Sequence, residues 1–350
     1  MNPDWRAFLI AQGARITADD QVAPPPPAPG QGTAADCARF DLSHLGLIAV
    51  RGEDAETFLQ GQVTTDVRTV TDSHSQLAGL CSPKGRMLAL FRVMRLADGF
   101  YLQLPRERVA ETLKRLRLFV MRAKVTLDDA SDGPIRIGCS GSGAVDALGR
   151  LGLALPALDN DLVATDGVTL LRLPAPVPRF ELIGASERLT TLWDALKSDG
   201  AMGDADGWAL LDIRAGIPNV YPTTADTFVP QMVNLQHLDG VSFNKGCYVG
   251  QEVVARMQYL GTLKRRMYLA EVETQTAPQP GDELHSPAST SEQAAGRIVD
   301  ARPTGPDRYE LLAVVEIGAA EHGEVRLGAA GPLLRCEPPP YGFPAAASSP

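Results

Sequence analysis

The chain has 350 residues, enough for two or three domains, because a single hydrophobic core rarely grows past about 250 residues. Hydrophobic residues make up 44% and charged residues 21%, an ordinary globular balance, and no run approaches the ~20 apolar residues that a membrane span needs. Lys and Arg total 33 against 42 Asp and Glu, and the resulting net charge of −9 disfavours direct binding to nucleic acid.

The N-terminal part of the chain is predicted to be a disordered, Pro-rich arm over residues 1–36. Its Pro24-Pro25-Pro26-Pro27-Ala28-Pro29 run favours an extended polyproline conformation, which packs neither as helix nor as sheet. After it, Leu45–Arg51 has the apolar content of a strand, and Ala55–Leu59 is predicted to be a short helix that follows a turn.

A hairpin and a longer helix are predicted next. Arg86–Leu96 and Phe100–Leu104 are strand-like and flank Ala97-Asp98-Gly99, in which Asp-Gly tolerates the positive φ of a tight turn. Arg106–Phe119 has apolar residues at three- and four-residue spacing, which predicts a helix. Because helices do not regularly separate the strands, the fold class is α+β rather than a doubly wound sheet.

The rest of the chain divides into two further parts. A second mixed unit is predicted from about residue 123 to 200, with helices near Ala144–Leu151 and Glu187–Leu196. From Leu263 onward the helical periodicity ends, and strand-like runs alternate with Pro/Gly turns, which is typical of a small closed β-domain. No exposed heptad pattern indicates an oligomer interface.

The cysteines show neither a disulfide framework nor a metal site. They are odd in number and far apart, and none lies in a C-x-x-C pair; the histidines are equally scattered, so we expect no resident metal or iron–sulfur cluster. Met1–Ile10 lacks the apolar core of a secretory signal, so the protein is expected to be cytoplasmic. The five cysteines are Cys37, Cys81, Cys139, Cys247 and Cys336.

The segment around Cys247 is the strongest candidate for function. Turn residues precede it, and Gln251–Leu260 after Gly250 has the apolar face of a helix. Cys247 is therefore expected in a loop just before a helix N-terminus, two residues from Lys245. Unpaired helix N–H groups and a nearby ammonium would both stabilise a thiolate. The alternative reading is a small, buried apolar side chain, the commonest state of a free cysteine.

Four ordered motifs of the chain carry a family resemblance. The first is the stretch Lys245-Gly246-Cys247-Tyr248-Val249-Gly250-Gln251-Glu252. The other three are Phe58-Leu59-Gln60-Gly61-Gln62-Val63-Thr64-Thr65-Asp66, Cys81-Ser82-Pro83-Lys84-Gly85-Arg86, and Phe228-Val229-Pro230-Gln231-Met232 with Asn234-Leu235. Together they resemble the YgfZ family of folate-binding-like proteins, whose signature is similar to the first stretch. These proteins are relatives of the glycine-cleavage T-protein and act in making or maintaining iron–sulfur enzymes.

The resemblance implies a T-protein-like arrangement of two mixed α/β domains and a C-terminal β-barrel around a central cavity. The first domain would be discontinuous, formed by residues 37–122 and 206–260. The second would span residues 123–205, and the barrel residues 261–340.

The resemblance also implies a function. The chain would be an accessory protein for iron–sulfur cluster assembly or repair, including enzymes that thiolate tRNA, with Cys247 as its essential thiol and Lys245 maintaining its reactivity. Its partners would be iron–sulfur client enzymes and a folate-type small molecule, with no direct nucleic acid and no membrane. Cys81 also resembles a family position, although it could equally be packing at the end of a strand.

Tetrahydrofolate is the cofactor that the resemblance implies. Trp208 resembles a family tryptophan that contacts folate, and a pterin needs such a stacking ring together with an acceptor; the alternative is a hydrophobic anchor at a helix start. Tyr248, Gln251 and Glu252 would line the cofactor site, although Glu252 could simply complement a helix dipole and Tyr248 could belong to the core. Two departures weaken the folate reading: Arg214 stands where relatives often have glutamate, and Leu45 where some have tryptophan.

Two alternatives to the accessory function remain. A folate-dependent aminomethyltransferase would carry an acidic residue near Gly85–Ala89, and that stretch has no carboxylate to interact with the reacting amine. A conventional enzyme is therefore disfavoured. A non-catalytic binding module is the third class, and it predicts that replacing Cys247 leaves function intact.

Overall fold

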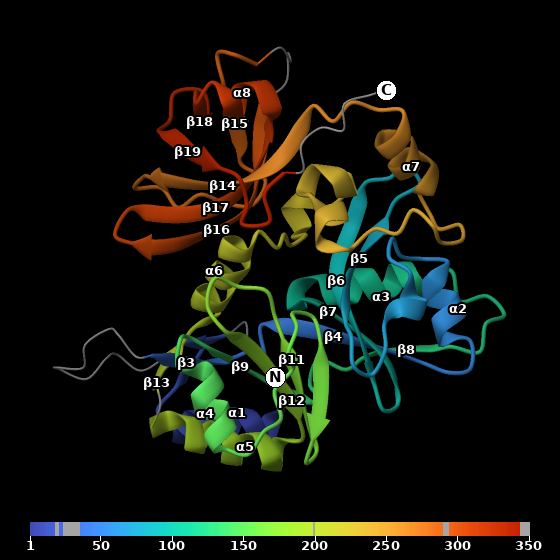
Figure 1. The fold of residues 1–350 in the computed structure, drawn as a ribbon, viewed down its shortest axis with the longest axis vertical. Helices are drawn as coiled ribbons and strands as arrows, with labels where there is room; N and C mark the ends of the chain where they lie inside the picture. The colour runs from blue at the N-terminus through green and yellow to red at the C-terminus, as the bar shows by residue number, and fades with distance from the viewer. Residues whose placement is uncertain (18–20, 24–35, 199, 290–293, 344–350) are drawn as a thin grey trace. The chain divides into compact units, whose positions relative to one another are not determined.

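The computed structural model describes residues 1–350 except 18–20, 24–35, 199, 290–293 and 344–350. The chain forms two compact units (Figure 1). The first unit comprises Met1–Ala78 and Phe91–Trp208, and the second comprises Gly79–Leu90 and Ala209–Pro350. Among the residues that the structure describes, no helix has the length and apolar character needed to cross a membrane.

The first unit begins with helix α1 (Pro3–Ala11), so the expectation of a disordered arm is wrong for the start of the chain. The Asn2 side chain caps α1 by accepting from two backbone N–H groups. Trp5 and Leu9, four residues apart, lie on one face of the helix and are fully buried. A short hairpin, β1 (Arg15–Ile16) and β2 (Val22–Ala23), follows. The Pro-rich run lies outside the described residues.

A six-stranded sheet forms one layer of the first unit. All neighbouring strands with described registers are antiparallel except β13 and β3, which are parallel. Helices α4 (Ala144–Arg150) and α5 (Ser186–Ala195) contribute buried apolar residues to the same core as α1. In spatial order the strands are β10 (Leu162–Thr165), β11 (Val168–Arg172), β12 (Arg179–Gly184), β9 (Ile135–Ser140), β3 (Cys37–Asp41) and β13 (Gly200–Gly203).

Strand β3 was assigned to the first domain in the sequence-based division, yet it pairs with β9, which lies among the residues assigned to the second. The reason is that Cys37 joins this core, Phe40 is buried beside Trp208, and the polar side chains between and after them find partners. Arg39 donates to the carbonyl of Gly200, and Asp41 accepts from the indole N–H of Trp5.

A second sheet has the order β5-β6-β7-β4-β8. The predicted hairpin is present as β6 and β7, and the predicted helix as α3 (Val109–Arg117), preceded by a 3-10 turn at Arg106–Arg108. Helix α2 (Ala55–Gln60) begins where it was predicted. The strands are β4 (Leu45–Arg51), β5 (Gln76–Cys81), β6 (Met87–Leu96), β7 (Gly99–Pro105) and β8 (Thr126–Asp129).

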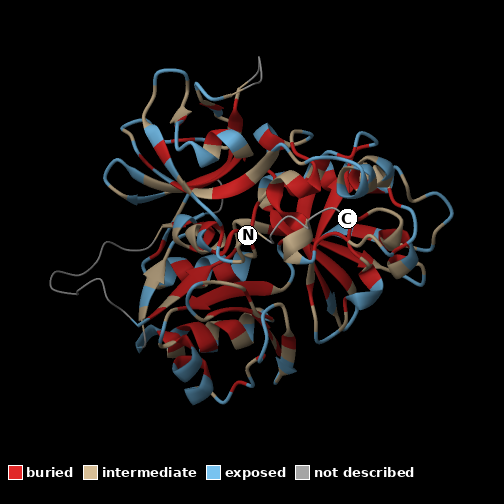
Figure 2. Cartoon of the chain, turned by 45° about the horizontal axis from the view of Figure 1, so that its top comes forward, coloured by how far each residue is buried: buried red, intermediate tan, exposed pale blue. Residues whose placement is uncertain are grey.

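The described residues of the second unit form helices α6 (Ala205–Ala215, which begins in the first unit) and α7 (Gln251–Tyr259), three 3-10 turns and the barrel. The strands close in the order β14-β17-β16-β15-β18-β19, which confirms the predicted C-terminal barrel and, with the mixed sheets, the α+β class. Burial follows the strands, whereas the connecting loops are mostly exposed (Figure 2). The short helix α8 (Ile317–Glu321) follows β17 in the chain. The barrel strands are β14 (Arg265–Glu273), β15 (Glu283–His285), β16 (Gly296–Gly305), β17 (Arg308–Glu316), β18 (Val325–Leu327) and β19 (Leu333–Glu337).

Candidate functional site

The Cys247 loop of the second unit is shaped by a glycine. Gly250 has φ +83° and forms the N-cap of α7, a backbone conformation that an L side chain rarely adopts. Helix α7 then begins at Gln251, so Cys247 lies just before a helix start. Cys247 is exposed and free, which excludes the reading of a buried core side chain.

Two motifs distant in sequence pack together at this loop. A Cβ on Gly250 would lie 2.4 Å from the backbone oxygen of Ser82, and a Cβ on Gly85 would lie 2.7 Å from Cβ of Val253. The Cys81–Arg86 turn and the Cys247 segment therefore approach so closely that both contacts require glycine.

A third motif holds this pair. The backbone N–H of Met87 donates to the carbonyl of Phe228, and the side-chain amide of Gln231 donates to the carbonyl of Val254 in α7, at 2.8 Å and 2.7 Å. The Ser82 hydroxyl donates to Asp226 at 2.8 Å. Three of the four sequence motifs thus meet in one unit, and Asp226 is a contributor that the sequence analysis missed.

The side chains around the loop differ sharply in exposure. Lys245 and Tyr248 are buried, and the ammonium of Lys245 lies 5.3 Å from the centre of the Tyr248 ring. Burial raises the pKa of Tyr248, and the nearby Cys81 thiol adds to this effect. Lys245 therefore contacts a buried tyrosine ring.

Cys81 and Cys247 have opposite environments. Cys81 is 1% exposed, and burial raises the pKa of its thiol to about 12. Because the thiolate is the nucleophile, Cys81 is inert at neutral pH. Of these two thiols, Cys247 is the one that a partner can reach.

The residues after Cys247 occupy the helix start. Gln251 is half-buried and Glu252 is exposed in the first turn of α7. A carboxylate there complements the helix dipole, which accounts for Glu252 without a ligand.

The two departures from the family pattern have structural partners. Arg214 forms a two-pronged ion pair with Glu310, with both N···O distances at 2.7 Å. The guanidinium therefore connects α6 to β17 of the barrel. Leu45 is the half-buried first residue of β4, and its carbonyl accepts from Arg136 at 2.8 Å.

Trp208 lies in the first unit, whereas the Cys247 loop belongs to the second. Its indole is 1% exposed and packs on the backbone of Gly138, where a Cβ would lie 2.3 Å from the ring. Phe40 packs beside the indole with a centroid separation of 5.2 Å, and the guanidinium of Arg179 lies 3.9 Å from the ring centre.

A buried carboxylate shares the face of the sheet on which Trp208 lies. Glu181 of β12 pairs directly with Gly138 of β9, and residues directly opposite each other project to the same side. Glu181 is fully buried and accepts from the side-chain amide of Gln103 at 2.9 Å. Burial raises the pKa of Glu181.

Glu181 and Gln103 leave two buried acceptors unsatisfied. Oε1 of each side chain is buried with no hydrogen-bond partner, a rare condition that requires explanation. Sequence analysis missed both residues. The signal was present in Phe180-Glu181-Leu182-Ile183, where an acid interrupts an otherwise apolar strand.

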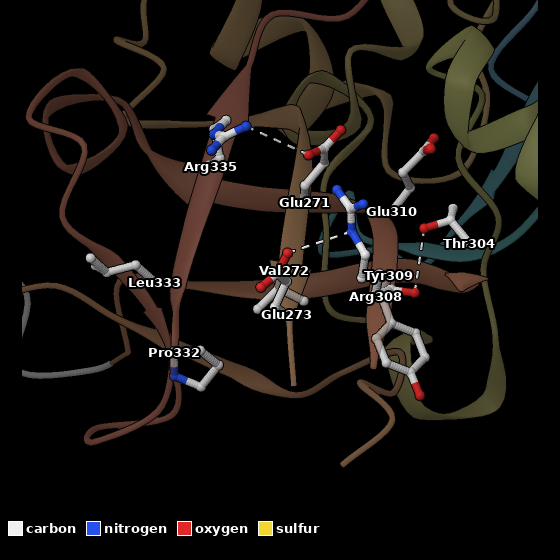
Figure 3. A pocket seen from close by; sticks show the side chains of 10 residues that line it. All are labelled: Glu271, Val272, Glu273, Thr304, Arg308, Tyr309, Glu310, Pro332, Leu333 and Arg335. Carbon is white, nitrogen blue, oxygen red and sulfur yellow. Dashed lines mark hydrogen bonds and ion pairs between the residues drawn. The ribbon is translucent and has the colours of Figure 1, made fainter. Parts of the chain in front are cut away.

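A depression of about 500 Å³ lies on the barrel (Figure 3), and none of the predicted site residues lines it. Each of its three glutamates pairs with an arginine: Glu273 with Arg308 at 3.5 Å, Glu271 with Arg335 at 3.8 Å, and Glu310 with Arg214 at 2.7 Å. It therefore presents no predominant charge to a ligand. Within the part of the chain that the structure describes, no three His, Cys, Asp or Glu side chains are grouped to hold a metal ion.

The fold and the matching family model define the class of protein. The GCVT N-terminal domain family matches residues 31–208. The glycine cleavage system aminomethyltransferase T from Bartonella henselae superposes with a TM-score of 0.70 over 97% of this chain and 98% of that one, at 18% identity. The chain thus has the T-protein fold.

Curated relatives narrow the class. The tRNA-modifying protein YgfZ of Klebsiella pneumoniae (strain 342) is 31% identical over 318 residues, covering 91% of this chain and 97% of the relative. The protein of the same name from Escherichia coli O45:K1 (strain S88 / ExPEC) is 30% identical with the same coverage. The chain belongs to the YgfZ family.

Proposed function

We propose that this protein is a cytoplasmic accessory factor for iron–sulfur enzymes, including enzymes that thiolate tRNA, and that it acts through Cys247. The observation that carries the proposal is the exposure of Cys247 on a loop that three separate motifs build. The name of its relatives, tRNA-modifying protein, supports the connection to tRNA. A reducing cytoplasm would keep the thiol free.

The client enzyme, rather than RNA, is the proposed partner. The net charge of −9 opposes binding to a phosphate backbone. Lys245, in contact with the Tyr248 ring, would hold the loop in the conformation that presents the thiol. Cys247 would act as a transient ligand or redox partner.

Complementation with Cys247→Ser tests this function. In cells that lack the endogenous protein, the variant should fail to restore thiolated nucleosides in tRNA and iron–sulfur enzyme activity, at unchanged protein abundance. Cys336→Ser is the matched control, because Cys336 is half-buried in barrel strand β19 and burial raises the pKa of its thiol to about 11. Full restoration of both activities by Cys247→Ser would reject a role for the thiol and would favour a non-catalytic binding module.

Tetrahydrofolate is the proposed small-molecule ligand, and the chemistry of the first unit supports it. A pterin presents an amino-rich edge that donates hydrogen bonds, and the two unsatisfied acceptors on Glu181 and Gln103 are what such an edge needs. Trp208 supplies an aromatic ring beside them. Calorimetric titration with tetrahydrofolate checks the proposal, and absence of heat and of binding at millimolar ligand would count against it.

Aminomethyl transfer is not proposed. The Gly85–Ala89 stretch forms the turn before β6 and its first residues, and it contains no carboxylate. The Arg86 side chain there donates to the carbonyl of Thr227, while Met87 and Ala89 are buried apolar residues. No residue of this stretch can act as an acid or base toward an amine.

A further inference from the structure

The indole of Trp208 has a cation directly over its face. The guanidinium carbon of Arg179 lies 3.9 Å from the ring centre, and the same group donates to the carbonyl of Trp208 at 3.4 Å. Arg179 is 1% exposed, so this contact is made away from water. A planar guanidinium stacked on a ring is a strong form of cation–π contact.

The register of the sheet brings this cation to the unsatisfied carboxylate. Arg179 and Glu181 are two residues apart on β12, so both side chains project to the same face. Their cross-strand partners on β9 are Ser140 and Gly138, and Gly138 is the residue on which the Trp208 ring packs. Arg179, Glu181 and Trp208 therefore share one buried surface of the first unit.

In this group of side chains, the Arg179 guanidinium lies where a bound pterin would lie. The pyrimidine edge of a pterin is a guanidine-type group, with an amino nitrogen on a carbon between two ring nitrogens, fused to a flat ring. It is bound by stacking on an aromatic side chain and by donation to a carboxylate. A guanidinium is planar, carries the same kind of donors, and here lies over the Trp208 ring.

We propose that Arg179 occupies the stacking position of the folate-type ligand on Trp208, so that the protein fills its own pterin site and must move Arg179 to bind. The inference rests on the proposed folate binding and adds its regulation. Burial of Trp208 to 1% exposure is then a property of the filled site. A ligand must break the cation–π contact and the bond to the Trp208 carbonyl before it can stack.

Removal of the guanidinium should expose the site. Tetrahydrofolate is titrated calorimetrically into the full-length protein and its Arg179→Ala variant, and the variant should bind at least about tenfold more tightly. Arg179→Met, which keeps an apolar stem over the indole, guards against loss of folding and should bind more tightly than the wild type by a smaller factor. Adding Glu181→Gln to Arg179→Ala should reverse most of this gain in affinity for tetrahydrofolate. Thermal unfolding verifies that each variant is folded.

A second measurement is specific to the guanidinium. Millimolar guanidinium ion should compete with tetrahydrofolate for Arg179→Ala and have no effect on the wild type. Arg172→Ala is the matched control, because Arg172 lies on the neighbouring strand β11, pairs with Asp159 and has no contact with the indole in the structure described. Its affinity should equal that of the wild type.

The contrary outcomes separate the two proposals. Tight binding to the wild type that Arg179→Ala weakens would make Arg179 a ligand contact, which overturns the inference and leaves folate binding standing. Equal affinity of the wild type and both Arg179 variants overturns the inference alone. Absence of binding to all variants rejects folate binding together with the inference. Tighter binding of tetrahydrofolate by the Arg172→Ala control would show that net charge causes the effect, and this would also overturn the inference about Arg179.

Discussion

At the scale of single residues, exposure and shape decide which groups can act. Cys81 and Cys247 belong to motifs that pack together, yet only Cys247 is exposed, whereas burial raises the pKa of Cys81 to about 12. The sequence favoured Cys247 as the functional thiol but could not decide whether either cysteine is buried, because the exposure of each depends on long-range packing. The glycine contacts between the motifs supply that packing.

Gly250→Ala should displace the Cys247 loop. The substitution puts a Cβ 2.4 Å from the Ser82 oxygen at a φ of +83°, so backbone strain adds to the steric clash. We expect a loss of about 1–3 kcal/mol in the free energy of unfolding, measured with denaturant. The complementation defect of Cys247→Ser should appear in part.

Gly246→Ala is the matched control for that loop. It lies beside Cys247, and a Cβ there meets no atom within 4 Å. Its effect should stay within about 0.5 kcal/mol. If Gly250→Ala were equally neutral, the close approach of the two motifs would not be needed to place the thiol.

At the scale of elements, the spacing of apolar residues predicted the helices and strands that form from local sequence, and missed a strand that depends on its partner. The helix at α3 was predicted from its spacing, and Val109, Leu113 and Leu116 are indeed its buried apolar residues. Strand β4 matches its predicted bounds. Strand β13, Gly200–Gly203, was missed because it has no β-branched or aromatic residue and exists through pairing with β3.

Glu181 shows why the candidate site could be predicted only in part. A glutamate in a strand normally marks a solvent-facing position, and its burial depends on the pairing of β12 with β9 and on contact with Gln103 of β7. The motif around Cys247 is contiguous in sequence and was found. The Glu181 group comes from residues spread over three strands and a helix, so no short pattern contains it.

A buried polar group connects the turn before η4 (Pro222–Thr224) to barrel strand β16. The Tyr221 hydroxyl donates to Asp300 at 2.6 Å, and Arg302 lies 3.1 Å from the same carboxylate. The pairing of β16 with β17 has a register shift between Ile298 and Asp300, and both residues are buried. The carboxylate is thereby held inside the second unit.

Asp300→Asn should change how stability depends on pH. Burial raises the pKa of Asp300 to about 6, so the folded protein retains a proton that the unfolded chain has lost above pH 4. The wild type therefore loses stability as pH rises from about 4 to 6, and an asparagine does not. Relative to the wild type, the variant should gain about 3 kcal/mol in unfolding free energy between pH 4 and pH 7.

Denaturant unfolding of both proteins at a series of pH values measures this difference. The substitution also exchanges the carboxyl group beside Arg302 and Tyr221 for an amide, which changes the stability of Asp300→Asn by an amount separate from this titration. The diagnostic quantity is therefore how the difference in unfolding free energy between the two proteins changes with pH. A difference that is flat between pH 4 and pH 7 would contradict a raised pKa at Asp300.

At the scale of the whole molecule, the first residues of the chain belong to the core. Five prolines at residues 24–29 give this part of the chain the composition of an arm, so the sequence-based division treated all of residues 1–36 as one. The apolar residues Trp5 and Leu9 are too few to outweigh that composition, yet in the fold they join a cluster with Phe180 and Trp193. Such a contribution becomes visible only once the distant strands are placed.

Trp5→Ala should therefore destabilise the first unit. The ring is fully buried, packs edge-on against Trp193 at 5.5 Å, and donates its N–H to the buried Asp41. Removing it leaves a cavity and takes one hydrogen bond from the buried Asp41, which keeps those from Ser43, and we expect a loss of about 3–5 kcal/mol. Ile10→Ala, on the same helix but 52% exposed, should change stability by no more than about 0.5 kcal/mol.

Hydrogen exchange followed by mass spectrometry is the suitable measurement, because it reports the protection of individual strands of the first unit. Peptides from β9 and β12, which surround the same core, should exchange faster in Trp5→Ala and remain protected in Ile10→Ala. Unchanged protection of both strands in Trp5→Ala would show that α1 adds no stability to this core. Faster exchange would make the N-terminal helix an integral part of the first unit, because its buried tryptophan would then stabilise strands more than 100 residues away in sequence.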